Sequence, residues 1–388
     1  MTMPTVSVIV VSYNVRHYVE QCLNSVLRSV PDAQLIVVDN SSMDGSVDYL
    51  RQRFPDVQVI ANEENLGFGR ANNMALELAQ GRYVLFLNPD TVVAEKTIPR
   101  CIEYMDTRPE TGAVGVRMMY ADGCFAPESR RSLPTPSVAF WHMTGLGRLF
   151  PESRVFARYH LTYENPDEEC PIDVVSGAYM FVRKSVLDVT GGFDERFFMY
   201  GEDIDLSYRI INAGYSNVYL PVPIIHYKGE STVKTSYRYA KVFYDAMLIF
   251  FDKHFRRSAW FITPLVWLVV GIRKIGTFIR ENLFRRRRAG TGNRTGCLFL
   301  GSEDSFRKAA ALIEKSAVLA APGFVRCGDS VPSGLKLDEI ETVVFDTGIF
   351  RYDTILEWIY NMYGSGRRIT VGFYSPDTGR LITDIEVL

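Results

Sequence analysis

Two patterns of hydrophobic residues alternate along the first 120 residues of the chain. Some stretches are apolar at every position and rich in β-branched residues, which is typical of strands buried on both faces. They lie at 6–11, 35–38, 57–61, 83–87 and 113–118. The stretches between them have the spacing of amphipathic helices, and they lie at about 17–27, 44–54, 69–78 and 95–105. Strands that alternate with helices predict βαβ units, and therefore an α/β fold with a parallel sheet.

Polar residues directly follow four of these predicted strands, at 12–14, 39–42, 62–67 and 88–90. In open α/β sheets, ligands bind beyond the carboxyl ends of the strands. We therefore expect a binding site there. The irregular stretch 121–170 is rich in Pro, Arg and aromatic residues, and we interpret it as long loops around this site.

The rest of the chain divides into three parts. Strands at 173–182 and 218–220 and helices at 184–190, 204–212 and 237–255 complete a first domain, 1–255. After a segment at 256–289 and a linker at 290–294, residues 295–388 show a second strand–helix pattern, which predicts a small Rossmann-like α/β domain. This domain has no G-x-G-x-x-G motif, so dinucleotide binding is not supported and we expect a role in assembly or regulation.

The segment 256–289 has a composition of its own. Residues 258–272 carry no charge, whereas nine basic residues and one acid lie between 256 and 288. Fifteen residues make about 22 Å of helix, which is shorter than the roughly 30 Å core of a bilayer. With Trp260 and Trp267 as interface anchors, the pattern favours an amphipathic helix on an anionic membrane surface over a membrane span or a buried core helix.

The composition of the chain bears on its binding partners and on its cellular compartment. The chain has 43 basic and 45 acidic residues, a formal net charge of −2, so no excess of positive charge points to nucleic acid. The six cysteines form no C-x-x-C pair, which argues against a disulfide framework and indicates a reducing compartment. We expect a cytoplasmic protein at the inner face of the cell membrane, and we leave homo-oligomer formation open.

Two aspartates after predicted strands are candidates for ligand binding. Asp39, in VVDNSSMDGS, can accept hydrogen bonds from a base or a ribose. Asp90, which follows Pro89 in FLNPD, suits a hard cation whose remaining ligands come from substrate phosphates. Asp and Asn also favour tight turns and helix caps, so each motif alone leaves a purely structural role open.

A glycine-rich stretch, NLGFGRANN, runs from Asn65 to Asn73. Gly67 and Gly69 permit close approach of a ligand to the backbone, and Arg70 is a candidate for contacting a phosphate. The alternative is a tight connection between a strand and a helix.

An acidic cluster is the densest group of titratable residues. Five carboxylates fall within twelve residues: Asp194, Glu195, Glu202, Asp203 and Asp205. Crowded carboxylates raise one pKa toward the range of a general base, although Glu202 and Asp203 also suit the start of a helix. His226 follows a predicted strand and is either structural or, with Asp90, a metal ligand.

These motifs, in this order, resemble those of family 2 glycosyltransferases. The segments that carry the resemblance are SVIVVSYN, VVDNSSMDGS, NLGFGRANN, FLNPD, VSGAYMFVRKSVLDVTGGFDERFFMYGEDIDLSYR and IIHYKGES. The similarity is greatest to the rhamnosyltransferase-like bacterial subgroup and covers about residues 5–255. It implies a GT-A fold, in which a Rossmann-like nucleotide-binding sheet is joined to an acceptor-side half.

The resemblance also implies roles for individual residues. Asp203 would be the catalytic base, with Glu202 beside it, and Asp90 and His226 would bind the metal. Asp39 would contact the nucleotide base. Other donor-binding positions would be Ser12, Asn14, Asn65, Gly67, Arg70, Asn88, Gly177 and Ala178. The usual Asp-x-Asp motif reads Asn88-Pro89-Asp90 here, so we expect modest metal affinity, with the ion held partly by the donor.

The resulting hypothesis is an inverting, metal-dependent hexosyltransferase of bacterial surface polysaccharide synthesis. It would use Mg²⁺ or Mn²⁺ and move a sugar, with rhamnose as first candidate, from a dTDP-, UDP- or GDP-sugar to a hydroxyl of a lipid-linked saccharide. A catalytically silent protein that binds sugar nucleotides or acts as a scaffold at the membrane is the alternative. A processive synthase would need several membrane spans and a Gln-x-x-Arg-Trp motif, and the sequence has neither.

Overall fold

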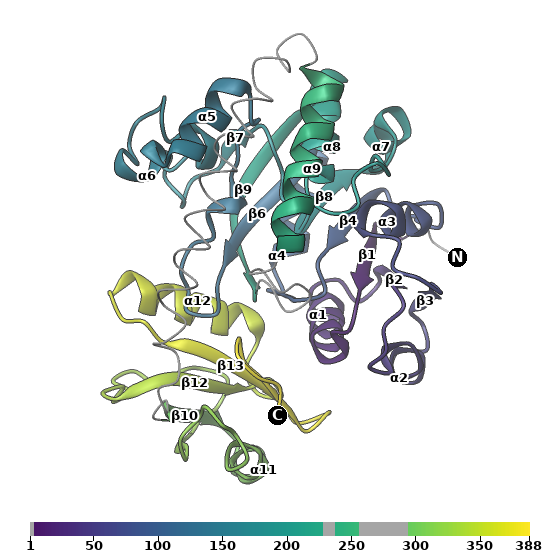
Figure 1. Cartoon of the computed structure of the whole chain (residues 1–388). Helices are drawn as coiled ribbons and strands as arrows, with labels where there is room; N and C mark the ends of the chain where they lie inside the picture. Colours follow the sequence, from purple (N-terminus) through teal and green to yellow (C-terminus); the bar gives the residue numbers. More distant parts are fainter. Residues whose placement is uncertain (1–3, 228–236, 256–293) are drawn as a thin grey trace.

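The computed structural model describes residues 4–227, 237–255 and 294–388 (Figure 1). The predicted membrane-associating segment at 256–289 and most of the predicted linker lie outside these residues. Among the described helices, none has the length and apolar character needed to span a membrane.

The first half of the large sheet follows the predicted βαβ pattern. Strand β1 (Val6–Ser12) pairs in parallel with β2 (Gln34–Asp39) and β4 (Tyr83–Leu87), and β2 pairs in parallel with β3 (Gln58–Ala61). The connecting helices are α1 (Arg16–Ser29), α2 (Ser46–Arg53) and α3 (Phe68–Leu76). Every residue of β1 and β4 is buried, as expected for strands covered on both faces.

The second half of the sheet is mixed. Strand β8 (Tyr179–Arg183) is antiparallel to both β4 and β6 (Thr111–Met119), and β6 is parallel to β9 (Ser216–His226). Two short strands, β5 (Thr91–Val93) and β7 (Cys170–Ile172), pair with β9. The order along the sheet is β3-β2-β1-β4-β8-β6-β9-β5. Helices α4 (Thr97–Thr107), α7 (Lys184–Thr190), α8 (Glu202–Asn212) and α9 (Tyr237–His254) belong to this half.

Three local predictions were wrong. The strand expected at 173–182 begins only at Tyr179, because the Tyr179 N–H donates to the Ser176 carbonyl in a turn (3.1 Å). The strand expected at 218–220 continues to His226, since a register shift against β6 accommodates Pro221 and Pro223. The stretch 121–170, expected to be irregular, contains α5 (Pro136–Thr144) and α6 (Leu146–Leu149).

A second, five-stranded sheet forms the C-terminal part. Its order is β11 (Gly323–Arg326), β10 (Gly296–Gly301), β12 (Ile340–Asp346), β13 (Thr370–Ser375) and β14 (Arg380–Ile382). The first four strands are parallel and β14 is antiparallel. Helices α11 (Glu303–Ile313) and α12 (Tyr352–Gly364) flank it. The α/β fold class is therefore confirmed for both parts of the chain.

Helix α12 faces the large sheet's domain, as Figure 1 shows. Its first turn is capped from the other domain, because the Glu95 carboxylate accepts the backbone N–H groups of Tyr352 (2.9 Å) and Asp353 (2.7 Å). The Arg28 side chain donates to the Thr347 carbonyl (2.7 Å). At Gly123, where φ is +78°, an added Cβ would lie 2.6 Å from the Ile359 carbonyl oxygen. The two domains are therefore in close backbone contact.

Replacing Glu95 with Ala should loosen this contact. The buried carboxylate satisfies two N–H groups that a helix start leaves without partners, and its loss should lower the free energy of unfolding by about 1–3 kcal/mol. Urea denaturation measures the loss, and hydrogen exchange at Tyr352 and Asp353 locates it. Glu357→Ala, an exposed change on the same helix, is the matched control, and equal effects of the two changes would contradict the assignment.

Candidate active site

A cleft of about 310 Å³ opens beside the carboxyl ends of β1 and β4 and the start of α8. Ten of the predicted site residues line it: Ser12, Asn65, Gly67, Asn88, Asp90, Gly177, Ala178, Glu202, Asp203 and His226. Sequence segments more than 200 residues apart therefore meet in one place, as the rule for α/β sheets predicts.

Asp39 and Ser12 lie side by side at the ends of adjacent strands. Asp39 is 1% exposed, and its Oδ1 accepts the Ser42 N–H (2.8 Å). Its Oδ2 and the Ser12 hydroxyl are buried and have no hydrogen-bond partner among the described residues. Buried polar atoms without partners are rare, so these two atoms are suited to contact a bound ligand.

Three predicted donor-binding residues are not among those that line the cleft: Asn14, Asp39 and Arg70. Asn14 instead joins two loops, since its side-chain oxygen accepts the Met43 N–H (2.7 Å). The Arg70 side chain is 58% exposed and lies 4.0 Å from Glu195.

The glycine-rich stretch packs tightly against the loop that precedes α8. Gly67 has a φ of +83°, and an added Cβ would lie 2.4 Å from the Phe198 carbonyl oxygen. That oxygen accepts the Phe68 N–H (2.9 Å), and the Asn65 side chain accepts the Gly67 N–H (3.0 Å). Gly67 is therefore required for a close connection, which was the structural alternative, and it lines the cleft as well.

Asp90 and His226 come together through strand pairing, because β5 follows Asp90 and pairs Thr91 with His226. His226 Nε2 lies 3.4 Å from Asp90 Oδ1 and 3.4 Å from the Asn88 side-chain nitrogen. His226 is 7% exposed and Asp90 2%. Two ligands at this spacing suit a cation only if further oxygens complete its shell. Within 4–227, 237–255 and 294–388, no group of three His, Cys, Asp or Glu side chains is placed to hold a metal.

Asp203 is held from two sides of the cleft. Its Oδ2 accepts the Gly177 N–H (3.1 Å) and an Arg131 N–H (2.5 Å), and its Oδ1 accepts the Ile204 N–H (2.8 Å). The side chains of Arg131 and Asp203 are each 12% exposed. A carboxylate fixed in this way keeps one orientation toward the cleft.

Arg131 was not among the predicted site residues. It comes from the stretch expected to form loops around the site, where the signal was a pair of arginines in SRRSL. Burial lowers the pKa of its guanidinium, but the charges of Asp203 and Tyr159 outweigh burial and raise it. Glu128, three residues earlier, also lines the cleft.

Glu202 is the second carboxylate of the cleft. Burial and the neighbouring Asp203 charge raise its pKa to about 8. Its Oε2 is buried without a hydrogen-bond partner in the described part of the chain. At neutral pH Glu202 is therefore largely protonated, so it differs in chemistry from its neighbour although the two are adjacent in sequence.

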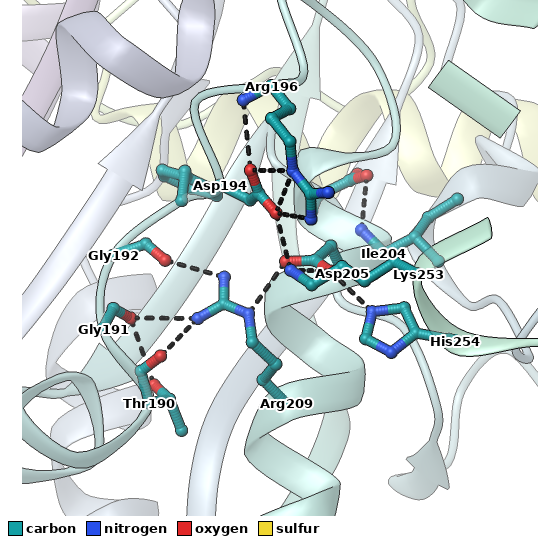
Figure 2. Close-up of polar contacts among 12 residues, drawn as sticks. Thr190, Gly191, Gly192, Asp194, Arg196, Ile204, Asp205, Arg209, Lys253 and His254 are labelled. Atoms are coloured by element: carbon teal, nitrogen blue, oxygen red, sulfur yellow. Dashed lines mark hydrogen bonds and ion pairs between the residues drawn. The ribbon is translucent and has the colours of Figure 1, made fainter. Parts of the chain in front are cut away.

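Two further carboxylates of the acidic cluster, Asp194 and Asp205, hold structural contacts (Figure 2). Asp205 is fully buried and bonds to Arg209 (2.8 Å), Lys253 (2.7 Å) and His254 (2.7 Å). Lys253 also forms an ion pair with Asp194 (2.7 Å). The pKa of Asp194 is lowered, and the main cause is a hydrogen bond from the Arg196 side chain. This network fastens the end of α9 to the first turn of α8, directly beside Glu202 and Asp203.

Several known proteins are similar to this chain in sequence. The model of the Glycosyl transferase family 2 domain matches residues 7–190. A protein of Mycobacterium tuberculosis (strain ATCC 25618 / H37Rv), named N-acetylglucosaminyl-diphospho-decaprenol L-rhamnosyltransferase, is 30% identical over 297 residues. The match covers 72% of this chain and 95% of that protein. The chain belongs to glycosyl transferase family 2.

Further relatives of this glycosyltransferase are more distant. Rhamnosyltransferase WbbL of Escherichia coli (strain K12) is 26% identical over 238 residues, covering 57% of this chain and 83% of that protein. The solved structure of the mannosyltransferase PcManGT from Pyrobaculum calidifontis, in complex with GDP-Man and Mn²⁺, aligns with a TM-score of 0.45. Its sequence is 20% identical, and the alignment covers 66% of this chain and 65% of that one. Family membership and the mixed sheet confirm the predicted GT-A fold.

The raised pKa of Glu202 should make stability depend on pH. A carboxyl group whose pKa rises on folding, here from 4.5 to about 8, stabilises the fold at low pH, and this contribution is lost as the pH rises through 8. Glu202→Gln removes the titration. It should therefore be on the order of 5 kcal/mol more stable than the wild type at pH 9 and nearly equal at pH 4.5.

Urea denaturation across this pH range measures the difference. Glu64→Gln, at an exposed position, serves as the control and should track the wild type at every pH. A constant offset between Glu202→Gln and wild type from pH 4.5 to 9 would contradict the assignment.

Proposed function

We propose that this glycosyltransferase is an inverting, metal-dependent hexosyltransferase that acts on a lipid-linked saccharide. The observation that carries the proposal is one cleft in which an oriented carboxylate, Asp203, shares the space with Asp90 and His226. Such an arrangement suits a reaction in which a hydroxyl group loses a proton while a diphosphate departs.

The reaction takes one step. Asp203 accepts the proton of the acceptor hydroxyl, whose oxygen attacks the anomeric carbon. The new C–O bond forms on the face opposite the bond to the nucleotide diphosphate, which breaks, so the configuration inverts. Mg²⁺ or Mn²⁺, bound by Asp90, His226 and donor oxygens, would supply charge stabilisation to the departing diphosphate. Ser12, which lines the cleft, presents its hydroxyl to the nucleotide, and Asp39 lies beside it at the end of the adjacent strand.

Rhamnose is the first candidate for the transferred sugar. Support comes from the names of two relatives, which are rhamnosyltransferases, one of them acting on N-acetylglucosaminyl-diphospho-decaprenol. A diphospho-lipid acceptor would place the protein at the inner face of the cell membrane, with the basic segment 256–288 on anionic lipid. The test is a panel of dTDP-, UDP- and GDP-sugars, scored by released nucleotide and by transfer to a short soluble acceptor.

Asp203→Asn should lower transfer by about 10²–10⁴-fold, the usual contribution of a general base. Donor binding should persist, because the amide has nearly the same shape. Steady-state kinetics and calorimetric titration of the donor measure the two effects. Asp188→Asn, at a side chain that is 62% exposed, is the matched control. Turnover near the wild-type rate would assign the base to another residue.

Asp90→Ala should weaken metal-dependent donor binding. The remaining His226 offers one nitrogen, whereas Mg²⁺ and Mn²⁺ prefer oxygen ligands. Titration of the donor with and without Mn²⁺ should show a large metal effect in the wild type and a small one in the variant. Full activity of the wild type in excess chelator would contradict the role of the metal.

A further inference from the structure

The stretch that follows α5 carries an exposed apolar surface. We name this surface the apolar tip and define it as residues 146–156, which include α6. Three large hydrophobic side chains are exposed here: Leu149 (73%), Phe150 (53%) and Val155 (59%). In the described part of the chain, nine large hydrophobic side chains are exposed, with exposed fractions between 39% and 94%. Three of them therefore lie within seven residues, which is the kind of clustering that marks an interaction site.

The apolar tip rests on a packed aromatic base. The ring of Phe156 lies 5.7 Å from that of Phe150 and 4.9 Å from that of Trp141, which belongs to α5. Pro151 is tied to the following chain, because its carbonyl accepts the Thr162 hydroxyl (2.5 Å). The exposed side chains are thus presented from an ordered support. Helices α5 and α6 lie at the upper left of the molecule in Figure 1.

Positive charge surrounds this surface. Between 145 and 158 the chain has Arg148, Arg154 and Arg158, all exposed, against one acid, Glu152. Arg154 is 3.9 Å from Glu164 and is thereby partly neutralised. Exposed apolar side chains between arginines match an anionic lipid surface, into which the apolar groups insert while the cations contact headgroups.

The end of α9 packs on α5, the helix that precedes the apolar tip in the chain. Helix α5 packs on the last turns of α9, where Ala139 and Phe251 are buried together with Met247 and Phe255 against them. Residue 256, the first of the segment with nine basic residues, directly follows.

The apolar tip is also connected to the catalytic cleft. Tyr159, three residues beyond Phe156, accepts the Ser132 N–H at its carbonyl (3.0 Å), and the residue before Ser132 is Arg131, the partner of Asp203. A bilayer contact at the apolar tip would therefore hold the acceptor side of the cleft near the headgroups, where a lipid-linked saccharide must be.

We propose that the apolar tip is a docking surface for an anionic lipid bilayer, separate in sequence from the basic segment. It rests on the proposed function in one respect, namely that the acceptor is attached to a lipid. The surface positions the enzyme and takes no part in the chemistry.

Vesicle sedimentation with the full-length protein tests this proposal. The vesicles contain phosphatidylcholine with about a third of phosphatidylglycerol. The buffer contains about 1 M NaCl, at which the Debye length is about 3 Å, so the electrostatic attraction between the basic segment and the lipid is weak. The Leu149→Ser/Phe150→Ser double variant should partition at least about tenfold more weakly than the wild type, because it lacks two apolar side chains that insert into the bilayer. Val155→Ser should partition measurably more weakly.

Val189→Ser is the matched control, since Val189 on α7 is 69% exposed, and it should partition like the wild type. Equal partitioning of the tip variants and the control would overturn the proposal. A lower Tm in the tip variants alone would show that another part of this chain covers the surface. A smaller mass of the tip variants in light scattering would show that a second copy of the chain covers it. Either result would also overturn it.

Transfer to a short soluble acceptor keeps the two proposals apart. It should be the same in the wild type, the tip variants and the control, since none of these residues lines the cleft. Loss of vesicle binding with normal transfer supports the docking surface. No transfer in the wild type with any donor would refute the proposed function and leave the vesicle result standing.

Discussion

The ion pair between Arg131 and Asp203 joins two separate stretches of the chain that line the cleft. Asp203 lies in the first turn of α8, after Glu202, whereas Arg131 comes from the stretch that leads to α5. Because both side chains are nearly buried, their attraction is screened less than it would be at the surface. The Gly177 N–H adds a third fixed point from the turn before β8. The geometry of the cleft depends on these contacts, since they position the carboxylate that we propose as the base.

The acidic stretch from 194 to 205 is divided by its surroundings into three kinds of carboxylate. Asp203 is paired with an arginine, Glu202 is buried and has a raised pKa, and Asp205 is bound by the side chains of Arg209, Lys253 and His254. The last of these ties α8 to α9 and so holds the first turn of α8 in place. Neighbouring residues of one type thus acquire different roles because burial and partners differ, which is a recurrent feature of enzyme sites.

Much of the fold was predictable from hydrophobic patterns. The strand β4 and the helix α7 have the predicted bounds, since a fully apolar run and a short helical stretch before Gly191 leave little ambiguity. The failures have a common cause: prolines and polar residues obscured pairing that only the tertiary fold decides, as in β9. For the site, the rule about strand ends predicted the cleft that Ser12 and Asp90 line, whereas Asp203 was expected from the acidic cluster and the family resemblance. Arg131 was missed because its role depends on a partner 72 residues away.

The stereochemistry of transfer tests the account most directly. The product formed from a nucleotide sugar of known anomeric configuration can be examined by NMR, through the coupling constants at the anomeric carbon. A single displacement with Asp203 as base predicts a product of the opposite configuration to the donor. A product that retains the donor configuration would require a different mechanism and would contradict the role given to this cleft.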